Sequence, residues 1–139
     1  MTNDPVLLVK RFFTDMLSPG NWSIVGEILD PSVVMHHPAS PEPIAGADAV
    51  QAVLAGFRAG FPDMTITVLD AFGDGDKAVA RWQMTGTNTA SLFGAPPTGK
   101  AVVVGGISIV RAAGGLIVED WVSEDTAGLM RQLSADAKV

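Results

Sequence analysis

Four acidic residues and one tryptophan lie within residues 117–125. Side chains of a β-strand point alternately to its two faces. One face therefore carries Glu119, Trp121 and Ser123, and the other carries Val118, Asp120 and Val122. If the strand continues by one more step, Asp125 joins the face of Trp121. Burial beside a tryptophan raises the pKa of a carboxyl group, which can then act as a general acid or base near neutral pH. The alternative is that Asp125 caps the helix that follows, because Asp is a preferred N-cap residue.

The adjacent histidines His36 and His37 form a second candidate for chemistry. Neighbouring strand residues point to opposite faces, so the pair is poorly placed to chelate one metal ion. We expect one ring to face inward and the other outward. The inward histidine could orient a substrate or move a proton. The alternative is a core histidine that only binds a backbone carbonyl.

A third group of candidates is Arg81, Trp82 and Gln83, in the middle of a predicted strand. Trp82 faces the opposite side from its two neighbours. Arg81 could form an ion pair with Glu119 or Asp120 across the sheet, or bind an anionic ligand. The ion pair is the simpler interpretation.

The elements that position these residues change from helical to strand periodicity along the chain. Helices are predicted over residues 4–17, 22–29, 46–60 and 125–133. Strands are predicted over residues 33–37, 64–72, 77–88, 100–111 and 116–123. Helices that precede antiparallel strands indicate an α+β fold rather than alternating α/β. No internal repeat or linker divides the chain, so residues 1–139 form one predicted domain.

Composition restricts the possible functions. The chain has 139 residues, 47% of them hydrophobic and 17% charged, and a net charge of −6. A chain without a basic cluster is a poor ligand for nucleic acid or an anionic membrane surface. Cysteine is absent, and no nucleotide, metal or nucleophile-elbow motif occurs. We therefore expect a cytoplasmic domain with no cofactor and no metal.

Short motifs spread along the chain resemble the SnoaL-like polyketide cyclases of the nuclear transport factor 2-like superfamily. In the first half these are His36 with Pro38, Gly46 before a helix, and Phe61-Pro62-Asp63. In the second half they are Arg81-Trp82, Thr85-Gly86-Thr87, Pro97-Thr98-Gly99-Lys100, Ile117-Val118-Glu119, Trp121, Asp125 and Gln132-Leu133. The resemblance implies a cone-shaped α+β barrel, in which N-terminal helices close a curved antiparallel sheet over a deep pocket. It also implies a homodimer formed through the sheet.

The same resemblance implies roles for individual residues. Asp125 matches the family's acid/base aspartate, and His36 matches its pocket histidine. Asn88 stands where a histidine is usual. The residues expected to bind the substrate are Trp121, Trp82, Phe57, Phe61, Glu119, His37 and Asn88.

The leading hypothesis is a cofactor-independent enzyme that performs acid–base chemistry on a small hydrophobic carbonyl or polyketide-like compound. Asp125 would transfer the proton and His36 would orient the substrate. The alternative is a non-catalytic module of the same fold, which binds a small molecule or dimerises while Asp125 only caps a helix.

Overall fold

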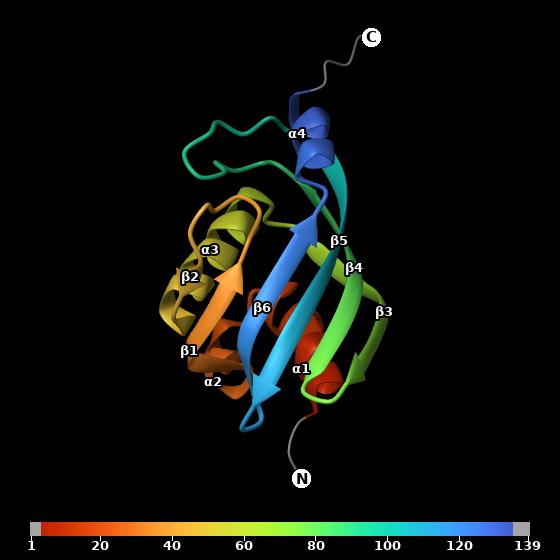
Figure 1. The fold of residues 1–139 in the computed structure, drawn as a ribbon. Helices are drawn as coiled ribbons and strands as arrows, with labels where there is room; N and C mark the ends of the chain where they lie inside the picture. The colour runs from red at the N-terminus through yellow and green to blue at the C-terminus, as the bar shows by residue number, and fades with distance from the viewer. Residues whose placement is uncertain (1–3, 135–139) are drawn as a thin grey trace.

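The computed structural model describes residues 4–134, which fold into one curved sheet with helices packed against one face (Figure 1). The predicted α+β class is confirmed, although the sheet stays open and does not close into a barrel. Its strand order is β2-β1-β6-β5-β4-β3. The strands are β1 (Leu29–His36), β2 (Ile44–Ala45), β3 (Thr65–Asp74), β4 (Lys77–Thr87), β5 (Ala101–Ala113) and β6 (Leu116–Glu124).

One strand pairing departs from the antiparallel sheet expected from the sequence. β1 runs parallel to β6, whereas the other neighbouring strands are antiparallel. A parallel neighbour needs a long crossover, and here most of the chain, including α3 (Ala47–Gly60), separates the two strands. The pairing places the end of β1, where the histidines lie, beside the middle of β6.

The N-terminal helix begins as the sequence predicts. Asp4 accepts a hydrogen bond of 2.8 Å from the backbone N–H of Leu7, and Pro5 opens α1 (Pro5–Arg11). The helix then widens into a π-helical segment, Phe12–Leu17. π-Helical turns are often found at functional sites. In this segment Phe12, Phe13 and Leu17 are buried and turn toward the inner face of the sheet.

The remaining helices close the two ends of the sheet. A short 3₁₀ turn, η2 (Trp22–Ile24), leads into α2 (Val25–Ile28), and α4 (Thr126–Ser134) follows β6. Gln132 of α4 binds both backbone groups of Val103 in β5, with hydrogen bonds of 2.8 and 2.9 Å. Because β6 ends opposite Gly106, this side chain satisfies backbone groups that have no neighbouring strand. Gln132 thereby fixes α4 over the end of the sheet.

The two faces of the central strands differ in burial. Most even-numbered residues of β4 and β5, including Trp82 and Ser108, point toward the helices and are buried. Odd-numbered residues point outward, and Ile107 remains 46% exposed. The Trp82 ring lies against Gly106, where a Cβ atom would collide with it. Within residues 4–134, no helix is long and apolar enough to cross a membrane.

Candidate functional site

A small cavity, called the inner chamber below, lies between the inner face of the sheet and the helices. Its volume is about 60 Å³. Most of its lining is apolar, and its polar groups are His37, Ser108, Asp120 and Glu124. The apolar lining residues are Phe12, Phe13, Leu17, Met35, Leu54, Phe57, Met64, Ile66, Trp82, Met84, Val104, Val122 and Leu129.

Asp120 is the most unusual of these polar residues. It is only 2% exposed, and its neighbours in the sheet are Met35 of β1 and Val110 of β5. Neither carboxylate oxygen has a hydrogen-bond partner among the described residues. Burial raises the pKa of Asp120 to about 7. A carboxyl group with this pKa can both accept and donate a proton at neutral pH.

His37 and Glu124 form a hydrogen-bonded pair at the edge of the inner chamber. The backbone N–H of Ala39 donates to Nδ1 of His37 at 3.0 Å, so that nitrogen carries no proton. The ring proton is therefore on Nε2, which lies 3.2 Å from Oε1 of Glu124 and donates to it. These two bonds fix the tautomer and orientation of a neutral His37 ring. Its side chain is 5% exposed and that of Glu124 is 12% exposed.

Ser108 supplies the only hydroxyl among the lining residues of the inner chamber. Its Oγ accepts a hydrogen bond of 3.1 Å from the indole N–H of Trp82. Ser108 lies opposite Val122 in the β5–β6 ladder, one step along the same face from the Val110–Asp120 pair. A ligand oxygen in the chamber can therefore meet a hydroxyl donor and a carboxyl group from adjacent strands.

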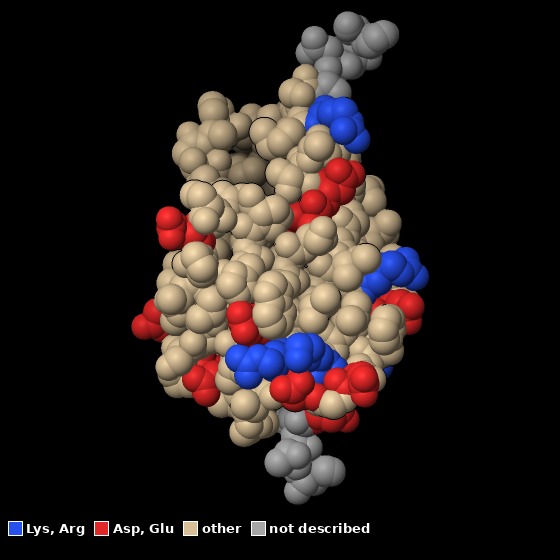
Figure 2. Space-filling view, viewed as in Figure 1, with Lys and Arg blue, Asp and Glu red and all other residues tan. Residues whose placement is uncertain are grey.

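A second, larger hollow, called the outer chamber, opens beside the inner one. Its volume is about 590 Å³. Figure 2 shows the opening at the upper end of the molecule, between α4 and the loop of residues 88–100. Phe93 of this loop has a positive φ of 46°, and its ring forms a T-shaped contact with that of Phe57, with centroids 4.9 Å apart. The loop thus forms the roof of the outer chamber.

Asn88 lines the outer chamber, but its polar atoms are used to hold the loop. Its amide donates to the carbonyl oxygens of Gly60 and Ala90, both at 2.9 Å. Its Oδ1 accepts bonds from the backbone N–H and the hydroxyl of Thr98. Asn88, which was predicted to bind the substrate, thus lies beside the outer chamber, and its polar contacts are internal.

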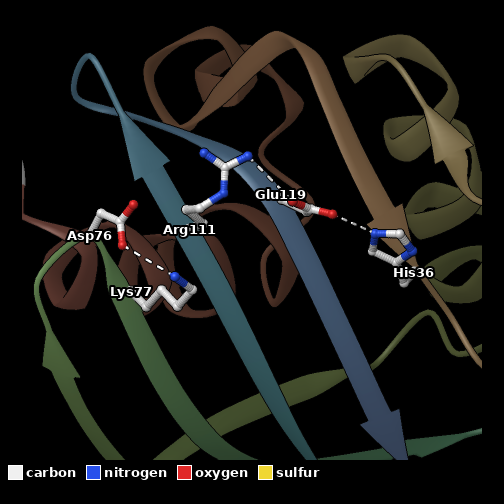
Figure 3. Close-up of polar contacts among 5 residues, drawn as sticks. All are labelled: His36, Asp76, Lys77, Arg111 and Glu119. Carbon is white, nitrogen blue, oxygen red and sulfur yellow. Dashed lines mark hydrogen bonds and ion pairs between the residues drawn. The ribbon is translucent and has the colours of Figure 1, made fainter.

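The prediction that His36 enters the pocket is wrong, because β1 turns His37 inward and His36 outward. Figure 3 shows Glu119 between His36 and Arg111 on the outer face of the sheet. The distance from Nε2 of His36 to Oε2 of Glu119 is 2.7 Å, and Arg111 contacts Oε1 at 3.3 Å. These hydrogen bonds, that of His36 first, lower the pKa of Glu119. Trp121 stacks on His36 with ring centroids 5.6 Å apart. Glu119 and Trp121 therefore also lie outside both chambers.

The prediction that Asp125 points into the pocket is also wrong. β6 ends at Glu124, so Asp125 precedes α4, is exposed and lines neither chamber. Its Oδ1 accepts a hydrogen bond of 2.8 Å from the backbone N–H of Gly128. The absence of a Cβ atom at Gly128 leaves room for the carboxylate. Asp125 has the helix-capping position that was the alternative interpretation.

The aromatic residues predicted to bind the substrate divide into two groups. Trp82 and Phe57 line the inner chamber, and Phe57 also lines the outer one. Phe61 is fully buried and lines neither, because it packs in the core against Gly86. Arg81 is exposed and has no ion-pair partner among the described side chains, since Arg111 contacts Glu119 instead.

Among the residues of the site, Asp120, Glu124 and Ser108 were not predicted. The sequence signal for Asp120 was an acidic residue between Val118 and Val122 on one face of its strand. Within the described part of the chain, no three His, Asp or Glu side chains are grouped to hold a metal ion.

Comparison with known proteins finds one matching family model and several similar solved structures. The model of the SnoaL-like polyketide cyclase family matches residues 7–133. A candidate SnoaL-like polyketide cyclase from Jannaschia sp. CCS1 is 25% identical, with a TM-score of 0.84 over 95% of this chain and 92% of that one. TsrD from Streptomyces laurentii is 29% identical, with a TM-score of 0.79 over 93% of each chain. No curated protein matches at a significant level.

IdmH from Streptomyces antibioticus, a candidate polyketide cyclase, is similar to the same extent. It is 26% identical, with a TM-score of 0.80 over 94% of this chain and 99% of its own. Most of each relative's length is therefore matched.

Proposed function

We propose that this chain, which belongs to the SnoaL-like polyketide cyclase family, is an acid–base enzyme for small, uncharged, hydrophobic carbonyl compounds. Asp120 is the proton-transfer group in this proposal, in place of Asp125. The observation that carries the proposal is a buried carboxyl group without hydrogen-bond partners, facing a cavity of mostly apolar lining. Such a group stabilises neither the fold nor an ion pair, and perturbed acids of this kind cluster at functional sites.

The proposed reaction begins with proton abstraction next to a carbonyl. The Asp120 carboxylate takes a proton from the α-carbon, and the C–H electron pair passes into an enolate. The hydroxyl of Ser108 donates a hydrogen bond to the enolate oxygen, where negative charge develops. Because Trp82 donates to Ser108, the hydroxyl proton is directed away from the indole and toward the chamber.

Two outcomes conserve atoms and charge from this enolate. In an isomerisation, the carboxylic acid of Asp120 returns the proton to a different carbon. In a cyclisation, the enolate carbon attacks a second carbonyl of the same molecule and forms a carbon–carbon bond. The new alkoxide then takes the proton from Asp120, which restores the carboxylate.

We expect the wild-type protein to accelerate exchange of α-protons for deuterium in simple aryl methyl ketones and β-diketones. Exchange reports proton abstraction alone, so the assay does not require the natural substrate. It is followed in D₂O by loss of the α-proton signal in NMR spectra. If no ketone of the panel exchanges faster than in buffer while several of them bind, the chain is a binding module rather than an enzyme.

We further propose that the chain forms a homodimer through the outer face of its sheet. Three large apolar side chains of β5, Val103, Ile107 and Ile109, are 52%, 46% and 38% exposed on that face. Figure 2 shows the same face largely free of charged residues between its two ends. An apolar surface of this kind is typical of an interface between subunits.

Replacing Ile107 with Glu is expected to convert the dimer into a monomer, because it places an unpaired charge in the centre of the apolar face. Sedimentation equilibrium measures the mass of each species. Leu7→Glu is the matched control, since Leu7 is equally exposed but lies on α1. The proposal fails if the wild-type protein is monomeric, or if both variants have the wild-type mass.

A further inference from the structure

The inner and outer chambers share four residues, His37, Phe57, Glu124 and Leu129. A group of atoms that moves from the outer chamber toward Asp120 must pass between them. We call these four residues the neck. They come from the residue that follows β1, from α3, from the end of β6 and from α4, so the neck lies where four segments meet.

The polar side of the neck is fixed by hydrogen bonds. His37 is held on Nδ1 by Ala39 and on Nε2 by Glu124. The ring of Phe57 packs against His37 with centroids 5.3 Å apart, and Leu129 is 5% exposed. Side chains that are packed and bonded in this way set a definite width for the passage.

The volumes of the two chambers are too different for one compact ligand to fill both. The outer chamber, at about 590 Å³, has the size of an ordinary small-molecule site. The inner chamber, at about 60 Å³, has room for only a few heavy atoms. A ligand that reaches Asp120 therefore keeps its body outside the neck and passes a small arm through it.

The charges of the lining restrict that arm further. No Lys or Arg lines either chamber among the described residues, whereas two carboxyl groups, Asp120 and Glu124, line the inner one. An anionic arm would be desolvated beside these groups without a counter-ion, which is strongly unfavourable. An uncharged carbonyl can instead accept a hydrogen bond from Ser108.

We propose that the neck is the specificity-determining element of this protein. It admits an uncharged, acetyl-sized carbonyl arm to Asp120 while the larger apolar body of the same ligand stays in the outer chamber. The inference rests on the proposed function only in naming Asp120 as the group that the arm must reach. The size and charge selection are properties of binding.

Three naphthalene probes with a common body test the proposal. They carry an acetyl group, a carboxylate or a branched pivaloyl group at the same ring position, and their affinities at pH 8 are measured by calorimetry. We expect 2-acetylnaphthalene to bind at least about tenfold more tightly than either 2-naphthoate or 2-pivaloylnaphthalene. Equal affinities, or tighter binding of the carboxylate, would overturn the proposal.

Two variants separate the neck from the chambers. Leu129→Ala widens the neck, so the pivaloyl probe should gain affinity relative to the acetyl probe while the carboxylate stays weak. Val104→Phe fills the inner chamber without touching the neck, so the acetyl probe should bind no better than unsubstituted naphthalene. Phe57→Leu repeats the widening test if Leu129→Ala does not fold, as judged by circular dichroism. Unchanged ratios in the folded variants contradict the proposal.

The results remain distinguishable from those of the proposed function. Probe selectivity without α-proton exchange would support the role of the neck and contradict the proposed enzymatic function. α-Proton exchange without selectivity between the probes would support the proposed enzymatic function and contradict the role of the neck in specificity.

Discussion

Replacing Asp120 with Asn is expected to lower the rate of α-proton exchange by about 10²- to 10⁴-fold, the usual contribution of a positioned general acid or base. Asn has nearly the same shape as Asp but cannot accept the proton. The inner chamber should therefore keep its form, and ketone binding should change by much less than the rate. The measurement is deuterium exchange at saturating ketone, with binding followed separately by calorimetry.

Asp125→Asn is the matched control, because it makes the same chemical change five residues later. Asn caps a helix about as well as Asp, so this variant should keep the wild-type rate and stability. Asp125→Ala should lose about 1 kcal/mol of unfolding free energy, as expected for a lost N-cap, and still exchange α-protons. A low rate of α-proton exchange in Asp125→Asn, with a normal rate in Asp120→Asn, would contradict the role of Asp120 and indicate that Asp125 transfers the proton.

The second large effect concerns stability. Burial raises the pKa of Asp120 from 3.8 to about 7, so the folded chain holds a proton that the unfolded chain releases between these values. The contribution of Asp120 to the free energy of unfolding is therefore most favourable below pH 3.8. It falls progressively as the pH rises to about 7, because the folded state must then bury a charged carboxylate. A shift of this size corresponds to at most about 4 kcal/mol.

Asp120→Asn removes that titration and should therefore be more stable than the wild-type protein at pH 8. The expected gain is about 2 to 4 kcal/mol, reduced from the upper limit because a buried amide also lacks partners. Urea unfolding of both proteins from pH 4 to pH 8 measures the gain. Subtracting the two curves cancels the other titrating groups. A difference that does not change with pH would contradict the burial argument.

Local pattern was sufficient to predict most of the fold. The spacing of apolar residues located each long helix and strand, and Asp4 and Pro5 marked the first helix correctly. Pairing between distant segments was not available from such patterns. The parallel contact of β1 with β6 depends on where the chain returns after β5, and the short strand β2 depends on how the loop after β1 folds back onto that strand.

The site shows why alternation alone was insufficient. Alternation of side chains along β6 correctly placed Asp120 on the opposite face from Glu119 and Trp121. It could not indicate which of the two faces points toward the helices. Both faces of β6 carry a large apolar residue, Trp121 on the outer face and Val122 on the inner one. Trp121 therefore suggested an interior position that it does not have.

The same ambiguity affected the histidine pair. The prediction that one ring faces inward was right, whereas the choice of His36 followed the family resemblance rather than the strand. Met35 is buried and His37 follows it by two positions, so these two share the inner face. Knowing the burial of Met35 would have been enough to identify His37.

The most direct test of the account is the ionisation of Asp120 itself. The carboxyl carbon of Asp120 can be followed by ¹³C NMR as the pH is changed, with its signal assigned by its absence from the Asp120→Asn spectrum. We predict a titration midpoint near 7. A midpoint near the ordinary value of 3.8 would mean that the carboxyl group is solvated, and would contradict its role as the acid and base of the inner chamber.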